Sequence, residues 1–123
     1  MARPAFIVAE PEPEQALSSR KILLETFKYN VITAHSTTET LELVGLFPNS
    51  SALIIHCGIM GFDAENVVQA VKKGAPQLPI IALTPTERDL KWANHVVHSH
   101  DPQELLDLVR QLFGDPRKLP VGS

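Results

Sequence analysis

The sequence predicts a single α/β domain with a doubly wound, five-stranded parallel sheet. Five short apolar runs alternate with segments of helical periodicity, and most of these runs lack the alternating polar residues of a half-exposed strand. Such strands are covered on both faces, as in parallel sheets flanked by helices. Of the 123 residues, 44% are hydrophobic, which is enough for one core without disulfides or a structural metal. We expect the domain to span residues 1–114, followed by a flexible tail over residues 115–123.

The five expected strands differ in how clearly the sequence marks them. The first four are runs of four or five mostly apolar residues, whereas the fifth has only two. They are expected at residues 5–9, 31–34, 52–55, 80–83 and 96–97. Ligands of doubly wound sheets bind at the carboxyl ends of the strands, so function should be sought at the residues found there. These residues are Glu10, His35, His56, Thr84 and His98.

The first two helices are expected at residues 15–29 and 37–47, where apolar residues recur at helical spacing. Ser36 and Glu39 have the spacing of a capping box, in which each side chain bonds a backbone N–H near the helix start. In the second helix we expect one apolar side to face the sheet, formed by Leu41, Leu43 and Val44.

The later helices have clearer ends. The third is expected at residues 64–73, with Asp63 as its cap and Gly74 after it. The last begins after Asp101, has Pro102 at the first helical position and ends before Gly114. Only thirteen residues lie between Thr84 and His98, and they must supply a loop, a helix and the fifth strand. Residues 86–92 can form about two turns, so the fourth helix should be short or missing.

Charge and composition exclude several functions. The net charge is −3, and no run of lysines or arginines is present, so we expect no nucleic-acid binding by this domain. No stretch approaches the roughly 20 apolar residues of a membrane span. The single cysteine, Cys57, excludes an intrachain disulfide and fits a reducing compartment, so a cytoplasmic location is expected.

In order and spacing, the strand ends resemble those of a bacterial response-regulator receiver domain, which has a flavodoxin-like (βα)5 fold. The resemblance spans residues 6–113. In that family the first strand is followed by paired acids, and the third ends in the phosphoacceptor aspartate before a methionine-containing loop. The fourth strand ends in a hydroxyl residue, and the fifth ends in a lysine–proline pair before the last helix. The matching segments are residues 6–13, 52–63, 79–84 and 96–102.

At these positions the sequence departs from the family. Glu10 keeps one acid and Pro11 replaces the other, while His56 stands at the acceptor position. Thr84 keeps the hydroxyl, but His98 stands in place of the lysine. A neutral imidazole is a poor Mg²⁺ ligand and cannot form an acyl phosphate. The resemblance therefore implies a degenerate pocket that has lost Mg²⁺ binding, with no cofactor in its place.

Alternative chemistries remain at this pocket. Glu10, His56 and His98 would converge there, and two imidazoles with one carboxylate could bind Zn²⁺ or serve a small-ligand sensor. A conventional phosphorelay receiver with an atypical site is a further alternative. An enzyme is not expected, because a glycine-rich phosphate loop and a nucleophile elbow are both missing, and Cys57 should be a buried, inert thiol.

We therefore expect a signalling module that binds a protein partner without being phosphorylated. Leu90 and Trp92 are candidates for the partner surface, together with His95, which stands where the family has an aromatic residue on the fifth strand. The alternative for Trp92 is that it covers the edge of the sheet. A homodimer through the face around the first or last helix is compatible with this interpretation.

Overall fold

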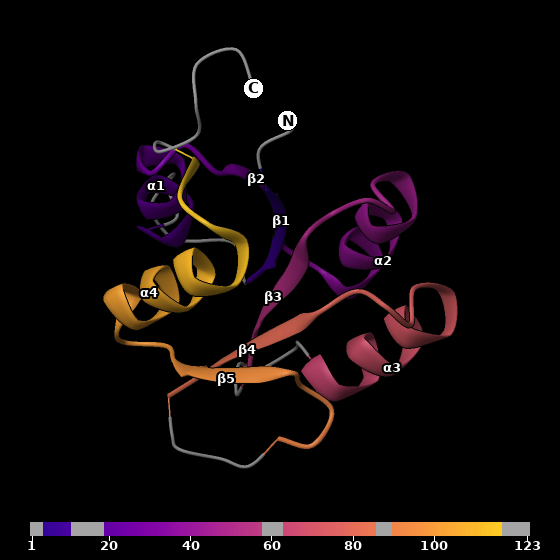
Figure 1. The fold of residues 1–123 in the computed structure, drawn as a ribbon. Helices are drawn as coiled ribbons and strands as arrows, with labels where there is room; N and C mark the ends of the chain where they lie inside the picture. The colour runs from indigo at the N-terminus through magenta and orange to yellow at the C-terminus, as the bar shows by residue number, and fades with distance from the viewer. Residues whose placement is uncertain (1–3, 11–18, 58–62, 86–89, 117–123) are drawn as a thin grey trace.

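The computed structural model describes residues 4–10, 19–57, 63–85 and 90–116. Their strands are β1 (Ala5–Ala9), β2 (Asn30–Ala34), β3 (Ala52–His56), β4 (Ile80–Thr84) and β5 (His95–His98). Their helices are α1 (Ser19–Thr26), α2 (Thr37–Leu46), α3 (Ala64–Gly74) and α4 (Pro102–Phe113). The strands form one parallel sheet in the order β2-β1-β3-β4-β5, with helices on both faces (Figure 1). The predicted fold class is confirmed.

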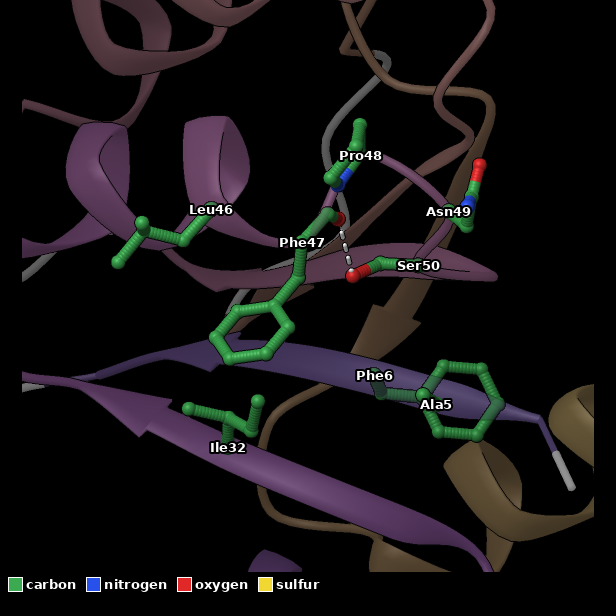
Figure 2. A pocket seen from close by; sticks show the side chains of 8 residues that line it. All are labelled: Ala5, Phe6, Ile32, Leu46, Phe47, Pro48, Asn49 and Ser50. Carbon is green, nitrogen blue, oxygen red and sulfur yellow. Dashed lines mark hydrogen bonds between the residues drawn. The ribbon is translucent and has the colours of Figure 1, made fainter.

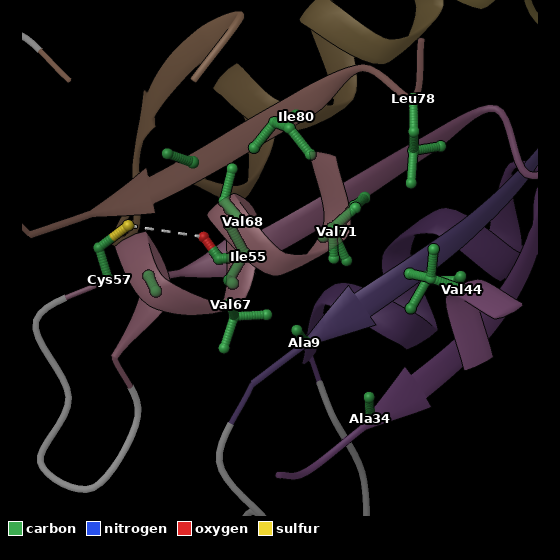
Figure 3. Packing of buried hydrophobic residues seen from close by; sticks show 14 residues of the cluster. Ala9, Ala34, Val44, Ile55, Cys57, Val67, Val68, Val71, Leu78 and Ile80 are labelled. Carbon is green, nitrogen blue, oxygen red and sulfur yellow. Dashed lines mark hydrogen bonds between the residues drawn. The ribbon is translucent and has the colours of Figure 1, made fainter. Parts of the chain in front are cut away.

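Two helix pairs cover the sheet, α2 and α3 on one face and α1 and α4 on the other (Figure 1). Successive strand residues point to opposite faces, so each strand contributes to two separate clusters. The cluster under α2 and α3 includes Ile7, Ala9, Val44, Leu53, Ile55, Val67, Val68, Val71 and Ile80 (Figure 3). The cluster under α1 and α4 includes Phe6, Val8, Leu24, Tyr29, Ile54, Ile81, Leu83, Leu105, Leu106 and Val109.

The predicted helix caps are present. Ser36 Oγ accepts a hydrogen bond from the backbone N–H of Glu39 at 3.0 Å, at the start of α2. Asp101 Oδ1 accepts one from Glu104 N–H at 3.1 Å, at the start of α4. These bonds satisfy N–H groups that have no partner within the helix. The helix starts that the sequence marks are therefore confirmed.

The orientation of α2 differs from the expectation. Leu41, predicted to face the sheet, is 37% exposed, and the prediction is wrong for this residue. Thr40 is fully buried instead, and its hydroxyl donates to Ser36 O at 2.8 Å. At 3.6 residues per turn, Thr40 and Val44 lie one turn apart on the inner side, which turns Leu41 toward solvent.

Other element bounds shift by a few residues. Within the described residues α1 ends at Thr26, before the predicted position 29, and Lys28 adopts a left-handed φ of 71° just after it. The predicted start of this helix, at residues 15–18, lies outside the described residues. The strand β5 runs through His95 and His98, beyond the two apolar residues predicted.

The connection from β4 to β5 is compact in its described part. Residues 90–94 form turns and a bend, as expected where the fourth helix is short or missing; residues 86–89 lie outside the described residues. Asn94 bonds both backbone groups of Ile80: its Oδ1 accepts from Ile80 N at 2.8 Å, and its own N–H donates to Ile80 O at 2.9 Å. This pairing holds the connection against the start of β4.

Past α4, the described chain continues to residue 116. Asp115 lies 3.3 Å from Arg110 Nε, so the first residue of the predicted tail contacts α4. Tyr29 Oη donates to Gly114 O, and the Phe6 ring packs edge-on against both Tyr29 and Phe113. Among the described helices, none has the length and apolar content needed to span a bilayer.

Candidate functional site

Four of the predicted site residues lie at one edge of the sheet, on four neighbouring strands. Glu10 and His56 follow directly after the paired residues Ala9 and Ile55 of β1 and β3. Thr84 is paired with His98 across β4 and β5. Because all strands are parallel, their carboxyl ends meet at this edge, as predicted. Pro11 falls outside the described residues.

The end of the first strand is fixed by two hydrogen bonds to the backbone of Glu10. Glu10 N–H donates to Ala34 O at 2.9 Å, and Glu10 O accepts from His35 Nδ1 at 3.2 Å. His35 follows β2, so this contact links the ends of two strands. The Glu10 side chain is only 3% exposed and Thr84 only 2%, whereas His56 is half-buried. The edge therefore keeps its carboxylate and hydroxyl inside the fold.

His56 and Cys57 are separated by the alternation of the strand. Cys57 is 5% exposed and belongs to the cluster under α2 and α3, with its Sγ 3.8 Å from Ile55 O (Figure 3). His56 follows Ile54 with period 2, which directs it toward the opposite face. Cys57 is therefore the buried thiol that the sequence predicts, turned away from the imidazole beside it.

At the end of β5, the His98 ring is hydrogen-bonded to the chain that follows it. Its Nδ1 accepts a hydrogen bond from the backbone N–H of His100 at 3.2 Å, and the two rings lie 5.5 Å apart. The backbone N–H of His98 donates to Glu104 Oε2 at 3.3 Å. The position where the resemblance implies a lysine ammonium thus holds an imidazole that is hydrogen-bonded to the backbone after it.

Among the described residues that end β1, β3, β4 and β5, Glu10 is the one carboxylate, and His56, on the strand between those of Glu10 and Thr84, offers an imidazole where Mg²⁺ prefers oxygen ligands. Asp63 already accepts two bonds at the start of α3, from Asn66 N at 3.2 Å and Asn66 Nδ2 at 2.7 Å. Across the described residues, no group of three or more His, Cys, Asp and Glu side chains is placed to hold a metal ion. The zinc alternative therefore gains no support from this structure.

The predicted partner residues are half-buried. Leu90 and Trp92 pack against the cluster under α2 and α3, and the backbone oxygen of Trp92 accepts from Lys72 Nζ at 2.8 Å. His95 is half-buried on β5. This packing favours the alternative in which Trp92 covers the edge of the sheet, while the role of the three residues as a partner surface stays a prediction.

A second region was not predicted from the sequence. At the end of α2, Leu46 is 71% exposed and Phe47 is 44% exposed. They border a cavity of about 270 Å³ at the amino ends of the strands, lined by Ala5, Phe6, Ile32, Leu46, Phe47, Pro48, Asn49 and Ser50 (Figure 2). A second cavity, of about 450 Å³, shares Pro48 and Ser50 with the first. The only sequence signal was the adjacent pair of large apolar residues before Pro48.

No protein-family model and no curated protein matches this sequence. Solved structures match it over most of its length. A response-regulator receiver domain from Clostridium thermocellum is 22% identical, with a TM-score of 0.75 over 89% of this chain and 94% of that chain. The chemotaxis protein CheY4 of Vibrio cholerae is 18% identical, with a TM-score of 0.73 over 90% and 99%. The response regulator TrrA of Thermotoga maritima, in complex with Mg²⁺–BeF, is 24% identical, with a TM-score of 0.68 over 89% and 98%. At these identities the likeness concerns the fold, and the chain has the fold of a response-regulator receiver domain.

Proposed function

We propose that this chain is a receiver-like signalling module that binds a protein partner without phosphorylation and without Mg²⁺, and that it catalyses no reaction. The observation that carries the proposal is the imidazole of His56 at the end of β3, between the strands of Glu10 and Thr84. An imidazole supplies no oxygen for an acyl phosphate and is a poor ligand for a hard cation. The likeness of the fold to receiver domains supports the signalling role.

The end of β5 adds support. A phosphoryl group at this edge would need a cation to balance its charge. His98 instead uses Nδ1 to accept the His100 N–H, and Glu104 lies against its backbone. The carboxylate of Glu104 at this place disfavours an added anion. Asp63 is bonded to Asn66 as the cap of α3, which favours a structural role for that carboxylate over a displaced acceptor role.

An amide NMR titration with Mg²⁺ and beryllofluoride, which mimics a phosphorylated aspartate, tests the proposal. We expect the amides of Glu10, His56, Thr84 and His98 to keep their shifts. The Thermotoga maritima receiver serves as the positive control, because it has been solved with this ligand. Shifts clustered at the strand ends of this chain would show a working phosphorylation pocket and contradict the proposal.

A variant with the family residues restored gives a matched comparison. Pro11→Asp, His56→Asp and His98→Lys together supply the second acid, the acceptor and the lysine. We expect this variant to gain beryllofluoride-dependent shifts at the same strand ends. If the folded variant shows no such shifts, the residues at these three positions are not what prevents binding, and the proposal loses its support from His56.

A further inference from the structure

Among the described residues, three of the five exposed large apolar side chains lie in one segment of the chain. Ile22 and Leu112 are exposed singly on α1 and α4, which is ordinary for a protein surface. In contrast, Leu41, Leu46 and Phe47 are all exposed within seven residues of α2 and its end. We call these three residues and Gly45, exposed between them, the α2 patch. A group of exposed apolar residues on one helix is typical of an interaction site.

The α2 patch continues into the cavity at the amino ends of the strands. Figure 2 shows the Phe47 ring reaching from the end of α2 toward Ile32 of β2, with Leu46 directed away along the helix. The strand β2 is at the edge of the sheet, and Ile32 is half-buried there. A partner side chain could therefore enter the cavity beside Phe47 while its backbone lies along α2.

No close packing within the described residues requires a glycine at position 45. It lies in the interior of α2, where glycine is less stable than alanine because it loses more backbone freedom. A Cβ added at Gly45 would meet no described atom within 4 Å, and its backbone does not adopt a positive φ. A bare Cα flanked by Leu41 and Leu46 does allow another backbone to approach α2 closely. Gly45 is therefore a position where a partner could approach α2 more closely than elsewhere along the helix.

The charge of α2 indicates what kind of partner fits. The helix contains Glu39 and Glu42 and no lysine or arginine. Two copies of the chain facing each other through α2 would bring these acids together, because both sides of a symmetric contact are the same surface. On the neighbouring α3, Lys72 and Lys73 lie in the last turn, at the end that shares a cavity with Pro48 and Ser50, and Lys72 Nζ donates to Trp92 O. The acids of α2 therefore favour a partner that carries basic residues.

We infer that the α2 patch is the docking surface for a basic amphipathic helix of a partner protein, which crosses α2 at Gly45 and inserts an apolar side chain beside Phe47. Helices that lay an apolar face on a partner use side chains at i, i+3, i+4 and i+7. The inference rests on the proposed function only in that both take the chain to act by binding protein. The α2 patch is separate from the strand ends that the beryllofluoride titration probes.

Two peptides test the inference directly. Each is a helix of about 18 residues, long enough to persist in water, with the same leucine stripe. Lysines flank the stripe in one peptide, and glutamates flank it in the other. We expect the lysine peptide to shift the amides of residues 37–47 and of Ile32, and to bind with a Kd at least roughly tenfold lower than the glutamate peptide.

Matched variants separate this surface from general attraction to an acidic protein. Glu42→Lys should remove most of the preference for the lysine peptide. Asp107→Lys makes the same charge change on α4 and should leave that preference unchanged. Leu46→Ser should weaken binding, and Leu112→Ser on α4 should not. Gly45→Ala should weaken binding while raising the melting temperature, and Gly74→Ala on α3, where an added Cβ also meets nothing, serves as its control.

Four outcomes would overturn the inference: equal binding of both peptides, no binding of either at millimolar concentration, shifts centred on Leu90, Trp92 and His95, or self-association through α2 without peptide. The third outcome would leave the proposed function standing and move its surface to β5. Beryllofluoride-dependent shifts at the strand ends would contradict the proposed function and leave docking on α2 intact. The two proposals can therefore fail separately.

Discussion

The strand ends and the α2 patch differ in the polarity of their side chains and in how far those side chains are buried. At the strand ends, Glu10 and Thr84 are polar yet almost fully buried, and backbone bonds fix the chain around them. At the α2 patch, Leu46 and Phe47 are apolar yet exposed. A polar group enclosed by its own domain has little exposed surface for a ligand, whereas an apolar side chain left in water is stabilised when a partner covers it. The strand ends, where the fold leads one to look for function, are thus distinct from the α2 patch, where we infer that a partner docks.

The largest difference in stability should come from truncating one apolar side chain in each region to alanine. Ile54→Ala, beneath the end of β3, should lower the free energy of unfolding by about 2–5 kcal/mol, because it leaves a cavity in a fully buried cluster. Leu46→Ala should change it by no more than about 0.5 kcal/mol. Urea denaturation of the two variants measures both values. A large loss of unfolding free energy for Leu46→Ala would show that the α2 patch is part of the core and does not differ from the strand ends in burial.

A second carboxylate at the strand ends should lower the free energy of unfolding. His56→Asp places a second acid at the register position next to the buried Glu10, and like charges disfavour each other. We expect a loss of about 1–3 kcal/mol, within the ordinary range for a disruptive substitution. Mg²⁺ should recover part of it, since two carboxylates suit a hard cation. Thermal melts with and without Mg²⁺ measure the effect; an unchanged melting temperature would mean that Glu10 and residue 56 do not interact.

Removing the N-cap of α4, which lies near the strand ends, should have an intermediate effect on stability. Asp101→Ala should cost about 1 kcal/mol, because Glu104 N–H loses its acceptor. The same substitution should shift the amides of His98 and His100, since Glu104 also binds the His98 N–H. Asp101→Asn keeps an oxygen acceptor and should lose less. If both variants are equally unstable, the carboxylate charge matters more than the cap.

The smallest expected effect is a gain in stability. Gly45→Ala should raise the free energy of unfolding by about 0.5–1 kcal/mol, because alanine is the better helix former and the added Cβ meets nothing. Chemical denaturation alongside Gly74→Ala resolves the change. A destabilised Gly45→Ala would reveal a packing constraint within the domain and remove the reason to assign the glycine to a partner.

The sequence predicted those parts of the fold that depend on local signals. Apolar runs located the strands, and Ser36 and Asp101 located helix starts, because a cap acts within three residues. The outer residues of β5 were missed, because His95 and His98 are polar although their backbones pair with β4. The strand ends were grouped correctly, since parallel topology alone brings them to one edge.

The α2 patch could not be predicted in the same way. Whether Thr40 or Leu41 faces the sheet depends on a rotation of α2 by one residue, and both choices give a plausible periodicity. The hydroxyl of Thr40 can be buried because it bonds Ser36 O within the helix, which the apolar pattern does not reveal. The cavity beside Phe47 joins residues more than 40 positions apart and exists only once α2 and β2 are placed.

The two clusters of the sheet also differ in when they can form during synthesis. The buried residues under α2 and α3 all lie between Ile7 and Ala82, whereas the other cluster needs Leu105, Leu106 and Val109 from α4. Translation delivers the chain from its N-terminus, and segments fold as they become complete. We therefore expect the face that carries the α2 patch to assemble first, while the face awaiting α4 stays open until the last helix has been made. A nascent chain lacking α4 would present that second face to chaperones.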